Sequence, residues 1–274
     1  MVSVLCPHCG AVLSCGAAQW KCENGHSFDV ARQGYVNLLP VFQKHSKRPG
    51  DSLLQVAARR EFLDGGAYLP VAETLCALAA EETPKTALDV GCGEGYYLTK
   101  LQEALPGLEG WGIDISKDAV RYAAVRNREA KFLTATASHL PFPDGSFDLL
   151  TSMFALTLPE EFARVLRPGG RFLQVTAGAE HLLGLKSVIY PVLKRQEKHP
   201  ETELPGFRLL REETLAFDFT LNGSGKILAL LSMTPHVMRI NAEGMARAQA
   251  LETLHDRAQV IFRVYTKIQN GEQP

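Results

Sequence analysis

Four cysteines and two histidines lie within residues 6–29, CPHCGAVLSCGAAQWKCENGHSFD. Cys6 and Cys9 form one close pair, and Cys22 and His26 form a second pair further along the chain. Two close pairs, each on a glycine-containing turn, can converge on one tetrahedral metal ion. The spacing therefore predicts a zinc site with these four ligands. Because four protein ligands fill the coordination sphere, we expect the zinc to be structural and not catalytic.

The other thiol and imidazole groups of this segment fit the paired spacing less well. Cys15 falls between the two pairs, and His8 lies inside the first pair, where a turn would point it outward. The alternative for the whole segment is a set of buried free thiols. A segment this short has too little core to fold well alone, whereas zinc binding is worth roughly 10–16 kcal/mol in finger peptides. We therefore expect the metal to order it.

A second candidate site is the glycine-rich stretch LDVGCGEGYY, residues 88–97. A predicted strand runs into Gly91, Gly93 and Gly95 and then into a helix, whose N-terminus offers free N–H groups to a polar ligand. The glycines let the backbone turn tightly and approach a ligand closely. Asp114 ends the next predicted strand, where a carboxylate suits a ribose diol. The alternative is a turn that needs glycine for its shape alone.

These residues need a framework, and the apolar pattern predicts one. Short apolar runs bounded by turn residues predict strands at 86–91, 110–115, 130–135, 147–154 and 170–177. Helical stretches separate the first three runs, and another helical stretch precedes the fifth. A later helix at 225–233 and a late strand at 259–268 should complete the sheet. Strands that alternate with helices indicate an α/β fold with a mainly parallel, doubly wound sheet.

The chain divides into three predicted segments. Residues 1–40 form a small zinc-binding module, residues 41–67 form a basic connector and a helix, and residues 68–274 form the domain that carries the glycine loop. Ser52 is a suitable cap for the connector's helix, and Gly65 with its glycine neighbour should end it.

Charge is distributed unevenly along the chain. The net charge of −1 predicts no strong overall attraction to nucleic acid. Residues 1–60, however, carry seven Lys and Arg against three Asp and Glu, a net charge of +4, and the remaining residues carry 22 against 27, a net charge of −5. Lys44, Lys47 and Arg48 form a basic run in the connector. A solvated link and a contact with nucleic-acid phosphates both remain open for this run.

The sequence also suggests where the protein works. No stretch of 18 apolar residues occurs, so we expect no membrane span, and the N-terminus shows no secretory signal. Four of the six cysteines crowd one short segment, which is more typical of a metal site in a reducing compartment than of a disulfide framework. We therefore expect the protein in the cytoplasm.

The glycine loop and Asp114, with the motifs SHLPFPDGSFDLL and ARVLRPGGRFL, resemble the class I (Rossmann-like) S-adenosylmethionine-dependent methyltransferases over roughly residues 68–180. The resemblance implies that the glycines pass the methionine part of the cofactor and that Asp114 holds its ribose. The cofactor-binding residues that it implies here are Gly91, Gly93, Glu94, Gly95, Tyr96 and Asp114. Thr136 departs from the family, because many members have an acidic residue there, near the adenine.

A more specific resemblance covers nearly the whole chain. The segments CPHC, CENGHSFDVARQGYVNLLP, RPGDS, ARREFLDGGAY, DVGCGEGYY and LLSMTPH occur in this order and resemble the bacterial 23S ribosomal RNA guanine-N1 methyltransferases. The family comprises two types that methylate neighbouring guanines in one hairpin, and RPGDS looks more like the first type. The resemblance implies S-adenosylmethionine as methyl donor, the rRNA hairpin as partner, Tyr68 and His181 as further cofactor contacts, and it allows a homodimer.

Two questions of mechanism follow from the resemblance. Guanine N1 carries a proton at neutral pH, so a base must remove it. The sequence does not identify this base, and Asp51 and Asp64 are candidates only because they flank the predicted cleft. Relatives commonly have an Ala-Pro pair after the fourth strand, facing the target group, whereas this chain has Ala155-Leu156.

Two other functions stay open from the sequence. The first is a small-molecule methyltransferase in which the zinc module is a lid, because the same fold serves many substrates. The second is a non-enzymatic RNA-binding protein that uses the domain as a scaffold. The intact glycine loop and Asp114 argue against the second.

Overall fold

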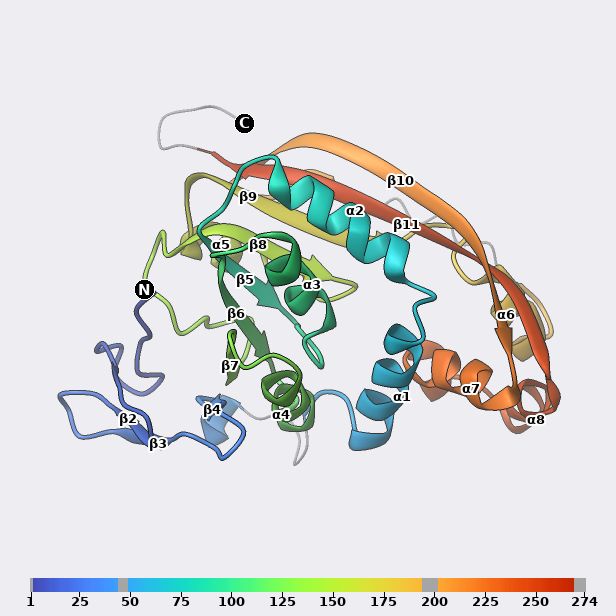
Figure 1. The fold of residues 1–274 in the computed structure, drawn as a ribbon, viewed down its shortest axis with the longest axis horizontal. Coiled ribbons are helices and arrows are strands. Elements are labelled where there is room, and N and C mark those ends of the chain that lie inside the picture. The colour runs from blue at the N-terminus through green and yellow to red at the C-terminus, as the bar shows by residue number, and fades with distance from the viewer. Residues whose placement is uncertain (1, 44–48, 194–201, 269–274) are drawn as a thin grey trace.

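The computed structural model describes residues 2–43, 49–193 and 202–268. These residues form a small three-stranded sheet near the N-terminus and a large eight-stranded sheet. The small sheet consists of β1 (Ser14–Cys15), β2 (Gln19–Lys21) and β3 (Ser27–Asp29), and each neighbour is antiparallel. It lies at one end of the molecule (Figure 1).

The large sheet has the strand order β10–β11–β9–β8–β5–β6–β7–β4. Its strands are β4 (Val36–Asn37), β5 (Thr86–Val90), β6 (Glu109–Asp114), β7 (Lys131–Thr134), β8 (Phe147–Met153), β9 (Leu166–Ala177), β10 (Phe207–Asn222) and β11 (Thr253–Lys267). Neighbours from β4 to β9 are parallel, whereas β11 is antiparallel to both β9 and β10. The sheet is therefore mainly parallel, as the sequence predicts, with an antiparallel edge.

The strand order reverses at β5. The chain moves from β5 to β6 and β7 on one side, and then returns to β8 and β9 on the other side. In open α/β sheets, this reversal leaves a crevice outside the carboxyl ends of the central strands, where ligands bind. The candidate cofactor residues should therefore be found at the carboxyl ends of β5, β6 and β8.

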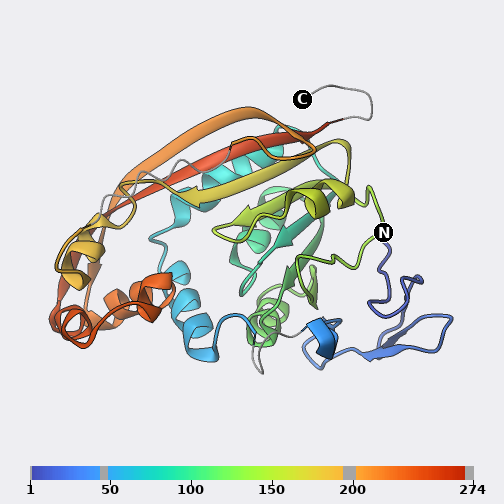
Figure 2. The ribbon, with the colours of Figure 1, turned by 180° about the vertical axis from the view of Figure 1, so that it is seen from behind.

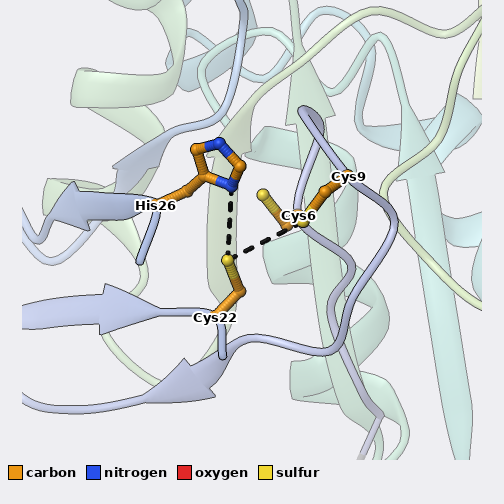
Figure 3. A group of neighbouring side chains, drawn as sticks. All are labelled: Cys6, Cys9, Cys22 and His26. Atoms are coloured by element: carbon orange, nitrogen blue, oxygen red, sulfur yellow. Dashed lines mark hydrogen bonds between the residues drawn. The ribbon is translucent and has the colours of Figure 1, made fainter. Parts of the chain in front are cut away.

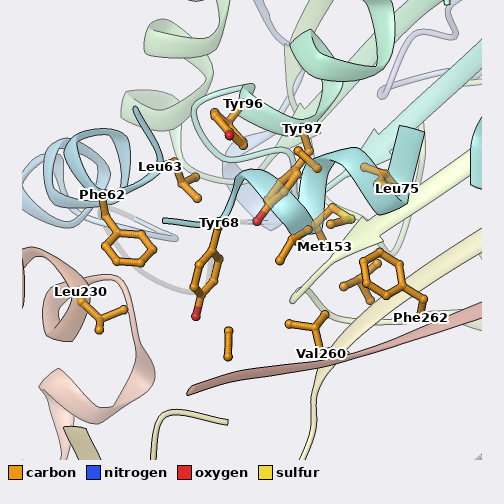
Figure 4. Close-up of a cluster of buried hydrophobic side chains, with 14 of the residues drawn as sticks. Phe62, Leu63, Tyr68, Leu75, Tyr96, Tyr97, Met153, Leu230, Val260 and Phe262 are labelled. Carbon is orange, nitrogen blue, oxygen red and sulfur yellow. The ribbon is translucent and has the colours of Figure 1, made fainter. Parts of the chain in front are cut away.

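The helices are α1 (Leu53–Asp64), α2 (Leu69–Ala80), α3 (Tyr96–Ala104), α4 (Lys117–Arg126), α5 (Pro159–Val165), α6 (Leu183–Ile189), α7 (Ser224–Ser232) and α8 (Ala242–Ala250), with short 3₁₀ turns at Val41–Gln43 and Pro235–Met238. One apolar cluster joins α1, α2, α3, α6, α7 and α8 to β11. Figure 4 shows part of this cluster. A second cluster covers the other face of the sheet with α5. The parallel part of the sheet is thus buried on both faces, as a parallel sheet requires, whereas residues of the edge strand β10 alternate with exposed positions.

The N-terminal module is packed onto the large sheet and is not a separate body. Val4, Leu13 and Trp20 belong to the same apolar cluster as Trp111 of β6 and Phe142. Strand β4, which lies within the predicted segment 1–40, pairs in parallel with β7. The division into segments 1–40, 41–67 and 68–274 stays a prediction, and the structure adds that the first segment contributes a strand to the main sheet.

Helix α1 lies between α4 and α7. Ser52 caps it as predicted, because its side chain accepts a hydrogen bond from the Gln55 amide while the Gln55 side chain accepts one from the Ser52 amide. This reciprocal arrangement is a capping box. Gly65 is the C-cap, and α1 then lies beside α7 (Figure 2).

The five predicted strands of the alternating region are confirmed as β5 to β9, and the predicted late helix and strand are confirmed as α7 and β11. The sequence analysis missed β10, although Leu215, Phe217 and Phe219 alternate along it and turn toward the core. Lys44, Lys47 and Arg48 lie outside the described residues. None of the helices in the described ranges combines the length and the apolar character that crossing a membrane requires.

Candidate cofactor and metal sites

The four predicted zinc ligands come together beside the small sheet (Figure 3). Their ligand atoms all lie within 4.8 Å of one another. The Cys9 and Cys22 sulfurs are 3.8 Å apart, and the Cys22 sulfur is 3.4 Å from His26 Nδ1. A tetrahedral zinc ion with bonds of about 2.0–2.3 Å keeps its ligand atoms roughly 3.4–3.8 Å apart. The donor set therefore fits zinc, and the assignment of each ligand stays a prediction.

Two similar turns hold these side chains. In the first turn the Gly10 amide donates to the Cys6 carbonyl at 2.8 Å, and in the second the Gly25 amide donates to the Cys22 carbonyl at 3.1 Å. Gly10 has a φ of 74°, and Gly25 has a φ of 83°. Such values suit glycine, because a Cβ atom makes them costly. Each turn can therefore aim two ligands at one point.

Hydrogen bonds already prepare one thiol for metal binding. Asn24 Nδ2 donates to the Cys9 sulfur at 3.3 Å. This bond, together with the Ala11 amide, lowers the pKa of the Cys9 thiol to about 6. Because a thiolate is the form that binds zinc, Asn24 supports the site from outside the ligand set. Cys15 and His8 are both exposed and do not belong to the cluster, as the sequence predicts.

The glycine loop follows β5 at the carboxyl edge of the sheet. The Gly93 amide donates to Asp114 Oδ2 at 3.0 Å, and the Ser116 amide donates to Oδ1 at 2.8 Å. Burial raises the pKa of Asp114, and these two N–H donors act in the opposite direction. The loop and the end of β6 therefore meet as the sequence predicts, with the carboxylate held in one orientation.

Two positions in the loop accept only glycine for steric reasons. A Cβ atom on Gly91 would lie 2.7 Å from the Ala155 Cβ, and one on Gly95 would lie 3.0 Å from the Ala123 Cβ. Both residues have φ values near 80° (75° and 81°). Gly95 is also the N-cap of α3, so the loop ends at a helix N-terminus. This close packing leaves backbone at the surface that a cofactor can approach.

Buried carboxylates surround the loop. Asp89, in β5, is 1% exposed, and its Oδ1 accepts a hydrogen bond from the Thr151 hydroxyl at 2.8 Å. Its Oδ2 and the Oε1 of Glu94 have no hydrogen-bond partner among the described residues. Burial raises the pKa of Asp89 to about 7 and also raises that of Glu94. Unpartnered buried carboxylates suit a cationic ligand, and S-adenosylmethionine carries ammonium and sulfonium groups.

Tyr68 and His181 form a buried pair. The Tyr68 hydroxyl lies 3.1 Å from His181 Nε2, although the two residues are 113 positions apart in the sequence. Burial lowers the pKa of His181 to about 4, so its imidazole is neutral at pH 7. Figure 4 shows Tyr68 among Phe62, Leu230 and Val260. The structure therefore joins two residues that the sequence analysis named separately.

The side chains of the remaining predicted residues Tyr96, Asp51 and Asp64 are each occupied by an arginine. The Tyr96 ring is buried under the Arg126 guanidinium, at 5.7 Å, so a cofactor contact from Tyr96 would come from its backbone. Asp51 pairs with Arg59 at 2.5 Å, and Asp64 pairs with Arg126 at 2.8 Å. These ion pairs make Asp51 and Asp64 supporting charges in this structure. Contact of the eight predicted residues with the cofactor stays a prediction.

The sequence analysis missed two groups at this site. Asp89 precedes Gly91 by two residues inside an apolar strand. A carboxylate within such an apolar run could have indicated a functional group beside the loop. Arg59 lies against the loop, with Nη1 3.4 Å from the point where a Cβ on Gly93 would be. No sequence signal identified Arg59, because it reaches the loop from α1 through the tertiary fold.

Comparison with known proteins matches one family model to the region of the cysteine cluster and another to the region of the glycine loop. Residues 4–47 match the family model described as RlmA, N-terminal, a zinc ribbon, and residues 88–174 match the model described as Methyltransferase domain. The chain is 37% identical over 237 residues to the 23S rRNA (guanine(748)-N(1))-methyltransferase of Streptomyces fradiae, which covers 82% of this chain and 83% of the relative.

Other relatives share only the central domain or the fold. The demethylmenaquinone methyltransferase of Thermus thermophilus is 40% identical over 107 residues, covering 35% of this chain and 49% of the relative. A chain from the solved complex that contains the Haloferax volcanii Trm112 methyltransferase activator aligns with a TM-score of 0.50 and 21% identity, over 80% of this chain and 96% of that chain. The latter supports the class I methyltransferase fold alone.

From the zinc site we expect that replacing Cys22 and replacing Cys15 will change the zinc content differently. Cys22→Ser should lose zinc and loosen the module, whereas Cys15→Ser should keep one zinc per chain because Cys15 is outside the cluster. Elemental analysis measures the zinc, and the fluorescence of Trp20, which is 8% exposed, reports the loosening as a red shift. Full zinc content in Cys22→Ser would contradict the predicted ligand set.

Asp89 predicts a pH dependence of stability. The folded protein holds a proton on Asp89 up to about pH 7, whereas the unfolded chain loses it near pH 4. The free energy of unfolding should therefore decrease as pH rises through this window, and Asp89→Asn should remove that part of the decrease. Urea denaturation at pH 5, 6, 7 and 8 measures it. The exposed carboxylate variant Asp218→Asn is the control, and an identical pH profile in Asp89→Asn and wild type would refute the assignment.

Proposed function

This chain belongs to the family of 23S rRNA (guanine-N1)-methyltransferases, and on that premise we propose that it transfers a methyl group from S-adenosylmethionine to N1 of one guanine in a 23S rRNA hairpin. The observation that carries the proposal is the 37% identity to the Streptomyces fradiae enzyme over 83% of that relative. The match of residues 4–47 to the zinc ribbon model adds to the proposal. The demethylmenaquinone methyltransferase, by contrast, aligns with only 35% of this chain.

When bound, S-adenosylmethionine supplies an electrophilic methyl group on its sulfonium sulfur. The chain's own task is then mainly to position the two reactants. In our proposal Asp114, oriented by the Gly93 and Ser116 amides, holds the ribose hydroxyls. The buried carboxyl groups of Asp89 and Glu94 lie beside the methionine part, whose positive charges would favour their ionised forms, and Tyr68 with His181 closes the opposite side.

Guanine adds two requirements to this arrangement. Its N1 is paired in a duplex, so the target base must be looped out or flipped before it reaches the crevice. Its N1 proton must also leave during the transfer. His181 is neutral at pH 7 with a pKa of about 4, and it is therefore a weak base. Its more suitable role is to hold Tyr68 through their hydrogen bond.

The proposed activity also implies a partner and a location for the protein. We expect the rRNA hairpin to contact the zinc module as well as the crevice, and we expect the protein in the cytoplasm, where thiols stay reduced and rRNA is present.

Incubation with labelled S-adenosylmethionine and unmodified 23S rRNA tests the activity. We expect label on N1 of one hairpin guanine, mapped by nuclease digestion and mass spectrometry, which also identifies the position. Asp114→Asn is the control, because it should weaken cofactor binding and reduce labelling while the zinc content stays at one per chain. Label on metabolites but not on rRNA would favour a small-molecule enzyme instead. RNA binding without label would favour a non-enzymatic binding protein.

We also propose a homodimer, which the family resemblance allows, because two copies would widen the crevice toward the size of an RNA hairpin. Sedimentation of the protein at several concentrations should show twice the chain mass of 30.1 kDa. A single species of 30.1 kDa at all concentrations, with full activity, would refute the need for a second copy.

A further inference from the structure

Phe154 has a strained backbone at the carboxyl end of β8. Its φ is 54°, and within the described residues only Thr83 and Leu182 share a positive φ without being glycine. A side chain with a Cβ atom is disfavoured in this left-handed region. The strain is held in place, because the Phe154 amide donates to the Val175 carbonyl at 2.8 Å. Strained residues of this kind concentrate at binding and catalytic sites.

The strained backbone places the Phe154 ring at the rim of the candidate cofactor site. The ring centroid lies 6.3 Å from the Tyr68 ring and 6.0 Å from the His181 ring. The next residue, Ala155, packs against the loop, since its Cβ is 2.7 Å from the point where a Cβ on Gly91 would be. Phe154 therefore lies between the glycine loop and the Tyr68–His181 pair.

The ring is also open to solvent. Phe154 is 40% exposed, whereas its neighbours Tyr68 and His181 are 1% and 8% exposed. It meets these two rings at tilted angles of 39° and 32°, so it does not stack face to face with either. An exposed aromatic face beside a methyl-donor site suits a flat heteroaromatic ring, because unpaired bases stack on aromatic side chains.

We propose that Phe154 stacks on the target guanine and fixes the plane of its ring. This inference rests on the proposed function. Once N1 has lost its proton, its lone pair lies in the plane of the base, so a methyl group can reach it only along that plane. A stacking partner that sets the plane therefore sets the direction of attack, and such alignment is a main source of rate in a transfer between two bound reactants.

The strain gives the test a distinctive signature. Phe154→Asn and Phe154→Gly suit a positive φ, so each should melt at the wild-type temperature or a few degrees higher. Each should bind S-adenosylhomocysteine as wild type does, because the ring is not among the groups proposed to hold the cofactor. The kcat/KM for an unmodified rRNA hairpin should fall roughly 5- to 150-fold, the range for loss of one stacked base. Phe154→Tyr should keep most of the activity.

Leu210→Ala is the matched control, because Leu210 is 42% exposed and lies on β10, a strand that carries none of the predicted site residues. It should leave kcat/KM unchanged. Wild-type kcat/KM in both Phe154→Asn and Phe154→Gly would overturn the inference alone, whereas no rRNA methylation by the wild-type protein would overturn it together with the proposed function. A parallel loss of melting temperature and S-adenosylhomocysteine affinity in both variants would instead assign Phe154 a packing role.

Discussion

The reversal of strand order at β5 is the constraint on which the rest of this structure depends. Because β6 and β8 leave β5 on opposite sides, the connections at their carboxyl ends diverge and leave a crevice. Three chemically different groups reach that crevice from three strands: the glycine loop after β5, Asp114 at the end of β6 and Phe154 after β8. Packing of the sheet on both faces fixes these strands, so the groups keep their relative positions.

The crevice combines buried acids with buried aromatic groups. Burial of a carboxylate is unfavourable unless a hydrogen bond or a positive charge compensates it. Asp114 has two amide donors, whereas Asp89 has one hydroxyl donor and an Oδ2 with no partner in the described chain. The resulting rise in the pKa of Asp89 to about 7 reflects that incomplete compensation. A bound cation would complete it, so the cofactor and the folded site stabilise each other.

The zinc ribbon is structurally continuous with the methyltransferase domain. Its apolar residues share a cluster with Trp111 and Phe142, the Leu5 amide donates to the Pro141 carbonyl at 2.8 Å, and β4 extends the main sheet beyond β7. Disorder in the ribbon would therefore expose the edge of β7 and part of the second apolar cluster. This packing gives the metal an influence on the catalytic domain without any part in the chemistry.

Local patterns determined much of this protein. The paired spacing of Cys6, Cys9, Cys22 and His26 and the turn-forming glycines between them are short-range features, and the structure brings the four side chains together. The strands β5 to β9 follow from apolar runs, and the glycine loop follows from residues adjacent in the chain. Such features can be predicted because neighbouring residues alone decide them.

Only the tertiary structure decided the rest. Tyr68 contacts His181, which is 113 positions away in the sequence, and Arg59 reaches Gly93 from α1. Ala155, which follows the carboxyl end of β8, packs against Gly91. The positive φ of Phe154 likewise has no local cause, since phenylalanine alone would avoid it. These contacts depend on how the sheet brings distant segments together, and the free energy of packing the whole core, not the preference of any short segment, sets that arrangement.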